Sequence, residues 1–113
     1  MLIDIKTILE IETIAMENPE GFTLFIPTRE LIQTGIAVGH AATQNEFGRS
    51  GIHACIKHSL YNYGHLGGWR NPDGRMQYDS VRIFTDLQKA IKYGRKQKQY
   101  SIFDLDNGWE IIL

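Results

Sequence analysis

Residues 67–113, GGWRNPDGRMQYDSVRIFTDLQKAIKYGRKQKQYSIFDLDNGWEIIL, carry the clearest local folding signals in this chain of 113 residues. The tetrapeptide NPDG at 71–74 is typical of a β-turn, with proline at the second position and glycine at the fourth. It predicts a hairpin between a short strand at 66–70 and a longer strand at 75–84. A basic helix follows, and the dipeptide Asn107-Gly108 predicts a tight turn between the last two strands.

The helix within this stretch has a recognisable start. The sequence Thr85-Asp86-Leu87-Gln88 fits a capping box, so we expect Thr85 or Asp86 to cap it. Its buried stripe is expected to consist of three apolar residues: Leu87, Ala90 and Ile91. Lysine and arginine crowd its last turn, where they stabilise the helix dipole.

The first half of the chain supplies two more helices and two strands. Apolar spacing in residues 3–17 predicts a helix. The β-rich run 22–26 and the small apolar run 35–39 predict two strands, which we expect to pair as a hairpin with a long loop. An amphipathic helix is predicted over 49–63, with Ser50 as its N-cap.

Together these elements predict one α+β domain over residues 1–113. We expect a mostly antiparallel sheet of five or six strands, with about three helices on one face and the element order α-β-β-α-β-β-α-β-β. An antiparallel sheet can leave its other face in water. The sequence does not indicate which face of the strand 75–84 is buried, because both faces mix polar and apolar residues.

The composition is that of an ordinary globular domain, with 42% hydrophobic and 22% charged residues. The single cysteine, Cys55, excludes an intramolecular disulfide, which favours a reducing, cytoplasmic setting. Asp4, Lys6 and Glu10 interrupt the apolar run near the first residue, so we expect no secretory signal peptide there. No stretch approaches the roughly 20 apolar residues of a membrane span, and we expect no membrane contact.

The net charge of −1 conceals an uneven distribution. Residues 1–47 carry seven acids and two bases, and residues 48–113 carry ten bases and six acids, which gives −5 and +4. Such a chain can present a positive face to an anionic partner. The alternative is that both charge sets are dispersed over the folded surface.

The residues that could carry catalysis or bind metal do not form a recognisable motif. His53 and His58 would lie about 140° apart around a helix, whereas zinc takes about four converging ligands. We therefore expect no metal, and we expect the histidines at the surface or its boundary. Cys55 falls on an apolar helix face, which does not favour a reactive thiolate. Asp79 with a histidine would make an acid–base pair, but a strand carboxylate beside Arg82 or Arg75 is more often an ion pair. The sequence predicts no catalytic residue and no cofactor.

The most suggestive polar cluster combines the loop 43–49 with Gly68-Trp69-Arg70. Glutamine and asparagine offer donors and acceptors, arginine can fork onto a carboxylate or phosphate, and tryptophan adds a stacking surface. The predicted binding surface for a ligand or partner consists of Gln44, Asn45, Arg49, Trp69, Arg70 and Asp79. The alternative is that the loop amides satisfy the loop backbone and that Trp69 belongs to the core.

Several short segments of the chain carry a family resemblance. The patterns FT at 22–23, TQNEFG at 43–48, GGW at 67–69, YDS at 78–80 and QYSIFDL at 99–105 resemble small uncharacterised domains encoded by bacteriophages and other mobile elements, particularly of gut bacteria. The likeness covers most of residues 18–110. It implies a bacterial cytoplasmic setting and contact with host machinery, and it brings no catalytic role with it.

We expect from these observations a small non-enzymatic binding module that contacts a host protein or an anionic ligand. A protein is the first expected partner, and a nucleic acid or nucleotide is the second, although a pI of 6.4 is low for nucleic-acid binding. The alternative is a small enzyme acting on a nucleotide or nucleic acid, with His40, Asp79 or Arg49 involved. The C-terminal hairpin has an edge that can pair between subunits, which is compatible with a homodimer.

Overall fold

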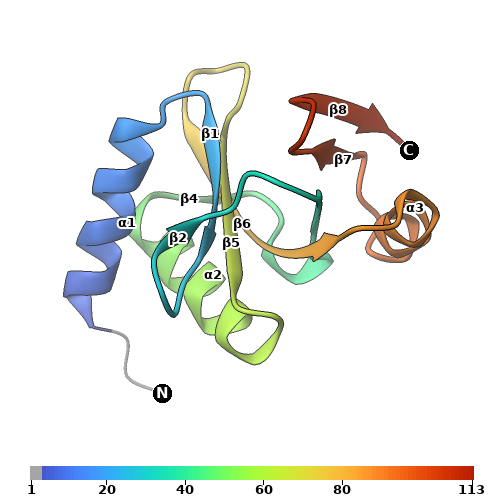
Figure 1. Ribbon diagram of the computed structural model, residues 1–113. Coiled ribbons are helices and arrows are strands. Elements are labelled where there is room, and N and C mark those ends of the chain that lie inside the picture. Colours follow the sequence, from blue (N-terminus) through green and yellow to red (C-terminus); the bar gives the residue numbers. More distant parts are fainter. Residues whose placement is uncertain (1–3) are drawn as a thin grey trace.

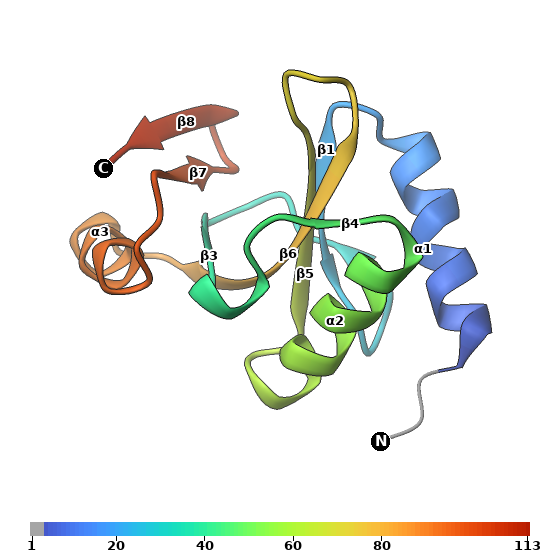
Figure 2. The same ribbon diagram turned by 180° about the vertical axis from the view of Figure 1, so that it is seen from behind.

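Three helices pack on one face of a single curved sheet in the computed structural model, which describes residues 4–113 (Figure 1). The helices are α1 (Ile5–Glu17), α2 (Gly48–Tyr61) and α3 (Leu87–Lys96), and a one-turn 3-10 helix, η1 (Ala41–Thr43), precedes α2. Helices α1 and α2 contact each other, whereas α3 lies apart from them at the other end of the sheet (Figure 2).

The sheet contains eight strands: β1 (Gly21–Phe25), β2 (Glu30–Leu31), β3 (Ile36–Gly39), β4 (Glu46–Phe47), β5 (His65–Arg70), β6 (Met76–Phe84), β7 (Ser101–Asp104) and β8 (Trp109–Ile112). They are paired antiparallel in the order β2-β1-β5-β6-β3-β7-β8, and β4 pairs with β6 outside this path. The α+β prediction is confirmed. The strands beyond the predicted five or six are β2 and β4, which have two residues each.

The predicted hairpin between 22–26 and 35–39 is wrong. Strand β1 pairs with β2 on one edge and with β5 on the other, so Leu24 faces both Leu31 and Leu66. Strand β3 pairs with β6 and β7 instead. The connection between β1 and β3 contains β2, which fills the outer edge of β1 locally. The inner edge of β1 is thereby left for a strand from the second half of the chain.

The two predicted helix starts have different outcomes. Asp86 caps α3 as predicted, and its Oδ1 accepts a hydrogen bond of 3.0 Å from the backbone N–H of Lys89. The prediction that Ser50 caps α2 is wrong, because Phe47 occupies the cap position without a side-chain bond. Gly48 has a φ of 64°, a left-handed value that glycine adopts without strain, and the chain turns into the helix there.

The side chains of strand β6 alternate between the helix-covered face of the sheet and the open face. Tyr78, Ser80 and Phe84 are buried on the helix side. Gln77 and Asp79 alternate with them and belong to the open face, since successive side chains of a strand point to opposite sides. The structure thus settles which face of this strand is buried.

Two hydrophobic clusters hold the helices to the sheet. The first packs α1 and α2 against β1, β5 and β6, and its most buried members are Ile11, Leu24, Ile52, Ile56 and Leu66. The second packs α3 against β3 and β7 through Ile36, Val38, Phe84, Ala90 and Ile102. Leu87, which was predicted to be buried in this helix, is 42% exposed. It stands in the first turn of α3, and the helix is buried against the sheet only from Ala90 onward.

His40 lies between the two clusters and is 4% exposed, which corrects its predicted place at the surface or boundary. Its Nδ1 is 2.9 Å from the carbonyl oxygen of Ser80, and its Nε2 is 2.8 Å from the hydroxyl of Tyr93. A polar ring can be buried here because both of its nitrogens have hydrogen-bond partners. His53, by contrast, is exposed as predicted.

Candidate binding groove

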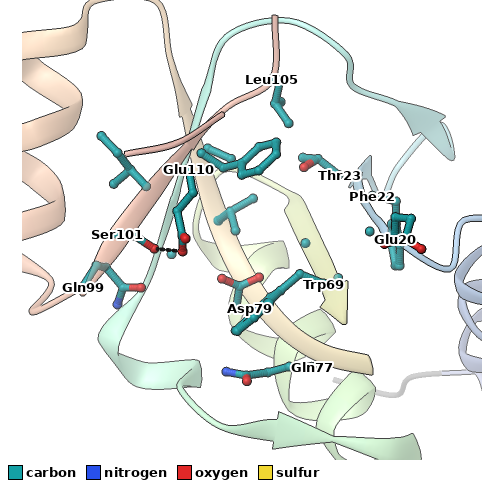
Figure 3. Close-up of a pocket in the computed structure, with 18 of the residues that line it drawn as sticks. Glu20, Phe22, Thr23, Trp69, Gln77, Asp79, Gln99, Ser101, Leu105 and Glu110 are labelled. Atoms are coloured by element: carbon teal, nitrogen blue, oxygen red, sulfur yellow. Dashed lines mark hydrogen bonds between the residues drawn. The ribbon is translucent and has the colours of Figure 1, made fainter. Parts of the chain in front are cut away.

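The helix-free face of the sheet is hollowed into a groove of about 1090 Å³ (Figure 3). Strands β1, β3, β5, β6, β7 and β8 all contribute to its lining, together with the loops at their ends. The hollow exists because the sheet curves, so that the β7–β8 hairpin stands across from β1 (Figures 1 and 2). The twist that strands carry gives a sheet of this size such curvature.

Two rows of side chains cross the groove floor. The first row consists of direct cross-strand partners on β1, β5 and β6: Thr23, Gly67 and Asp79. The second row is formed in the same way by Gly21, Trp69 and Gln77. Both rows face the groove because they lie two positions apart on each strand. The glycines keep the floor open around the larger side chains.

Asp79 stands in the middle of the groove, between Gln99 and Trp69 (Figure 3). Its carboxylate fits between two glycines. A Cβ added at Gly67 would lie 2.6 Å from Asp79 Oδ1, and one added at Gly39 would lie 2.7 Å from Oδ2. Within residues 4–113 its carboxylate oxygens make no hydrogen bond or ion pair, so the predicted alternative of an ion pair with a nearby arginine does not hold.

The setting of Asp79 alters its acidity. Burial raises the pKa of its carboxyl group to about 7, because few polar groups replace the water that would solvate the charge. Near neutral pH the side chain therefore exists in both protonation states. A group that binds the ionised form favours one of the two states, so the protonation of Asp79 can respond to what binds in the groove.

Gln99 completes the polar centre of the groove. Its Nε2 donates to the carbonyl oxygen of Gln97 at 3.1 Å, so its Oε1 is the atom turned toward Asp79. That oxygen lies 2.7 Å from the position of a Cβ at Gly39, the same distance as Asp79 Oδ2. The two acceptors therefore converge beside the backbone of Gly39.

Aromatic side chains form the two walls. Trp69 is 44% exposed on the β5 side, so the alternative that placed it in the core does not hold. Phe103 and Tyr100 are exposed on the opposite side, at β7 and just before it. Next to them the hydroxyl of Ser101 donates to the carboxylate of Glu110 at 2.7 Å (Figure 3). The groove thus offers apolar surface on both sides of a polar floor.

The charged side chains that line the groove are all acidic. Four acidic residues take part in it: Glu20, Asp79, Asp106 and Glu110. Among the described residues that line the groove, none is a lysine or an arginine. The bases that dominate residues 48–113 therefore lie outside this surface.

The structure brings four of the six predicted site residues to the groove: Gln44, Asn45, Trp69 and Asp79. Arg49 and Arg70 are not part of the lining. The Nε of Arg49 is 3.1 Å from both carboxylate oxygens of Glu12 on α1, and the Nε of Arg70 donates to the carbonyl oxygen of Pro19 at 2.8 Å. Both guanidinium groups are therefore engaged by partners outside the groove.

Sequence reasoning missed Gln99, Phe103 and Glu110 as groove residues. Phe103 could have been found from alternation, because it lies next to the buried Ile102 and therefore points to the other face of the sheet. Gln99 lies in the loop before β7 and carries no such signal.

A second polar cluster lies on the helix side of the sheet, around His40. Burial lowers the pKa values of His40 and His58, whose ring centroids are 4.8 Å apart. His58 Nδ1 is 2.8 Å from the hydroxyl of Ser80. Because both nitrogens of His40 are engaged by Ser80 and Tyr93, His40 is not hydrogen-bonded to Asp79, and this acid–base pair does not form.

Comparison with protein-family models, with curated proteins and with solved structures found no match for this chain. In the part of the chain that the structure describes, no three His, Cys, Asp or Glu side chains come together as a metal site. Nor does any helix between residues 4 and 113 have the length and apolar character needed to cross a membrane.

Proposed function

We propose that this chain is a non-enzymatic binding module that holds an extended segment of a partner protein in the groove. The observation that supports this is the open groove of about 1090 Å³ with exposed aromatic walls at Trp69 and Phe103. Exposed aromatic side chains around a concave surface are typical of binding sites. The resemblance to mobile-element domains implies that the partner is a protein of the bacterial host.

The polar floor suits a peptide backbone. Gln77, Asn45 and the other amides of the lining can donate to carbonyl groups and accept from N–H groups of an extended chain. The aromatic walls can cover side chains that alternate along that chain. This combination favours a protein segment over a compact small molecule.

The charge of the groove argues against the anionic partners that the sequence left open. Nucleic acids and nucleotides are bound through phosphates, which need lysine or arginine for neutralisation. The described lining has four carboxyl groups and neither of these bases. An anionic ligand is therefore a poorer candidate for this surface than a neutral or cationic one.

One observation keeps an enzyme as the second candidate. The pKa of Asp79, about 7, is suited to general acid–base catalysis near neutral pH. Catalysis also needs a nucleophile or a second acid–base group beside it, and His40 is engaged elsewhere. Turnover of a panel of nucleotides by the purified protein, lost in Asp79→Asn, would favour the enzyme.

The test of the binding proposal is selection from a displayed library of random peptides about 10 residues long. Such peptides span roughly 35 Å when extended, and the longest dimension of the molecule is 37 Å. Enriched peptides should bind the wild-type protein at least about tenfold more tightly than Trp69→Ala or Phe103→Ala.

A matched control is Trp109→Ala. Trp109 is 64% exposed and is not part of the groove lining, so its loss should leave peptide affinity unchanged. Failure to enrich any peptide, or equal losses in the Trp69 and Trp109 variants, would overturn the proposal.

A further inference from the structure

The centre of the groove brings two hydrogen-bond acceptors together beside the backbone of Gly39. Asp79 Oδ2 and Gln99 Oε1 each lie 2.7 Å from the point where a Cβ at Gly39 would stand. Gly39 is buried, and because it has no side chain both oxygens can approach its backbone closely. On the other side, Gly67 leaves room for Oδ1 of the same carboxylate. The result is a recess lined by oxygen atoms.

The described residues supply no donor for these oxygens. The amide nitrogen of Gln99 is already bonded to the carbonyl of Gln97, so its orientation is fixed with oxygen toward the recess. The carboxylate oxygens of Asp79 have no hydrogen bond or ion pair within residues 4–113. Asp79 and Gln99 are half-buried, so these acceptors remain open to the groove, and a ligand that brings N–H donors can bond both of them.

We propose that this recess is the subsite for a lysine or arginine side chain of the bound protein segment. The inference rests on the proposed function of the groove and names the chemistry that the groove selects. An ammonium or guanidinium group carries several N–H donors in one positive group, so it can bond the carboxylate and the amide oxygen together. A neutral donor would satisfy the oxygens without the attraction of opposite charges.

Trp69 adds a second contact for a cation. It lies diagonally across from Asp79, because Gly67 pairs with Asp79 and Trp69 pairs with Gln77. Diagonal neighbours are within reach of a long aromatic side chain, and Figure 3 shows Trp69 beside Asp79. A cation in the recess can therefore also contact the indole face.

Binding should be coupled to the protonation of Asp79. The other titratable groups around it are Glu110 on β8, Glu20 and Asp106 on the rim, and His40 and Cys55 from the helix side. Burial keeps the last two neutral near pH 7, since it lowers the pKa of His40 and raises that of Cys55. A bound cation favours ionised Asp79, so affinity should rise with pH through about 7 and then level off.

The experiment uses the ¹⁵N-labelled full chain and three probes: the N-acetyl methylamides of lysine, arginine and glutamine. The backbone N–H signals of Gly39 and Gly67 report on the recess. These signals should shift when the lysine or arginine probe is added, and the shift should grow as the pH is raised through about 7. The glutamine probe should shift them much less. In a groove-binding peptide, replacing the basic residue by glutamine should weaken affinity about tenfold, or about 1.4 kcal/mol.

Two variants separate charge from space. Asp79→Asn retains the shape of the side chain and should abolish the response to the cationic probes and its pH dependence. Gly39→Ala retains the charge but places a methyl group where the two oxygens converge, and it should abolish the response as well. Glu17→Gln, an exposed carboxylate on α1, is the control that should change nothing.

Equal responses to glutamine and lysine, or an unchanged response in Asp79→Asn, would overturn the cation subsite. The groove would still be a peptide site if selected peptides required Trp69 and Phe103 but contained no basic residue. If the cationic probes shift Gly39 and Gly67 while no peptide is selected, the recess stands and the proposed function fails.

Discussion

The hydroxyl of Tyr93 lies 2.8 Å from Nε2 of His40 and joins α3 to the turn between β3 and η1. The other ring nitrogen, Nδ1, is 2.9 Å from the carbonyl oxygen of Ser80, which can only accept a hydrogen bond. Nδ1 therefore carries the proton, and Nε2 accepts from the tyrosine. One neutral imidazole thus connects the core under α1 and α2 with the core under α3.

Replacing His40 by alanine should lower the free energy of unfolding at pH 7 by about 2–4 kcal/mol. The change opens a cavity, leaves the Tyr93 hydroxyl without its partner, and removes one of the two hydrogen bonds that the Ser80 carbonyl accepts, the other coming from the backbone N–H of residue 40. Urea unfolding followed by tryptophan fluorescence measures the effect. Tyr93→Phe, which removes only the hydroxyl, should cost about 1 kcal/mol. A His40→Ala protein as stable as the wild type would contradict the connecting role of this ring.

The same ring should make stability sensitive to acid. Burial lowers the pKa of His40 below its ordinary value of 6.5, so the unfolded chain takes up a proton more readily than the folded one. Stability should fall as the pH decreases from 6.5 toward the native pKa. His40→Gln should show a shallower fall, and the remaining slope should come from His58 and His65, whose pKa values burial also lowers. An unchanged slope in His40→Gln would mean that His40 binds its proton as readily in the folded protein as in the unfolded chain.

Local signals were sufficient for the three helices and the six longer strands, but not for the two-residue strands β2 and β4. The NPDG turn at 71–74 and the Asp86 cap each depend on a few neighbouring residues, and both form as predicted. The pairing of β1 was wrong because it depends on contacts between distant segments. Gly67 and Gly68 pack against the Asp79 carboxylate and the Phe22 ring, which come from other strands. No local pattern indicates which distant side chain a glycine will accommodate.

In the candidate site, too, local sequence indicated some residues, whereas others depend on contacts between distant segments. Trp69 and Asp79 were found because each stands beside a recognisable turn or strand, and strand register then brings them onto one face. Arg49 was assigned to the site for its chemistry, but its carboxylate partner, Glu12, lies 37 positions earlier in the chain. Gln99 was missed because its role depends on the fold of the loop before β7. Residue type therefore indicated the chemistry, and only the fold assigned the partners.

Asp79→Asn should stabilise the protein at alkaline pH. Burial raises the pKa of Asp79 from 3.8 to about 7, so the folded state holds a proton that the unfolded state releases in this interval. Wild-type stability should decline from about pH 4 to pH 7 on this account, by about 2–4 kcal/mol. The asparagine variant has no charge to desolvate and should gain that amount at pH 8, with little change at pH 4. Loss of stability in the variant at pH 8 would show that the ionised carboxylate is well solvated.

Cys55 should be unreactive in the folded protein. Its side chain is fully buried in the core under α1 and α2, and burial raises the pKa of the thiol. Iodoacetamide at pH 8 should modify it only after urea unfolding, as mass spectrometry would show. Rapid modification of the folded chain would mean that the core around Cys55 opens readily.

Gly68→Ala should destabilise the fold through one neighbour. An added Cβ would overlap the edge of the Phe22 ring, which packs edge-on against Tyr78 with 6.5 Å between centroids. Displacing a packed ring should cost about 1–3 kcal/mol in urea unfolding. Phe22→Leu removes the ring edge, so Gly68→Ala should cost less in that background, and the double-mutant cycle gives the coupling. Additive effects would mean that the cost arises in the β5 backbone. A coupling near the full cost of Gly68→Ala would assign the glycine to this contact alone.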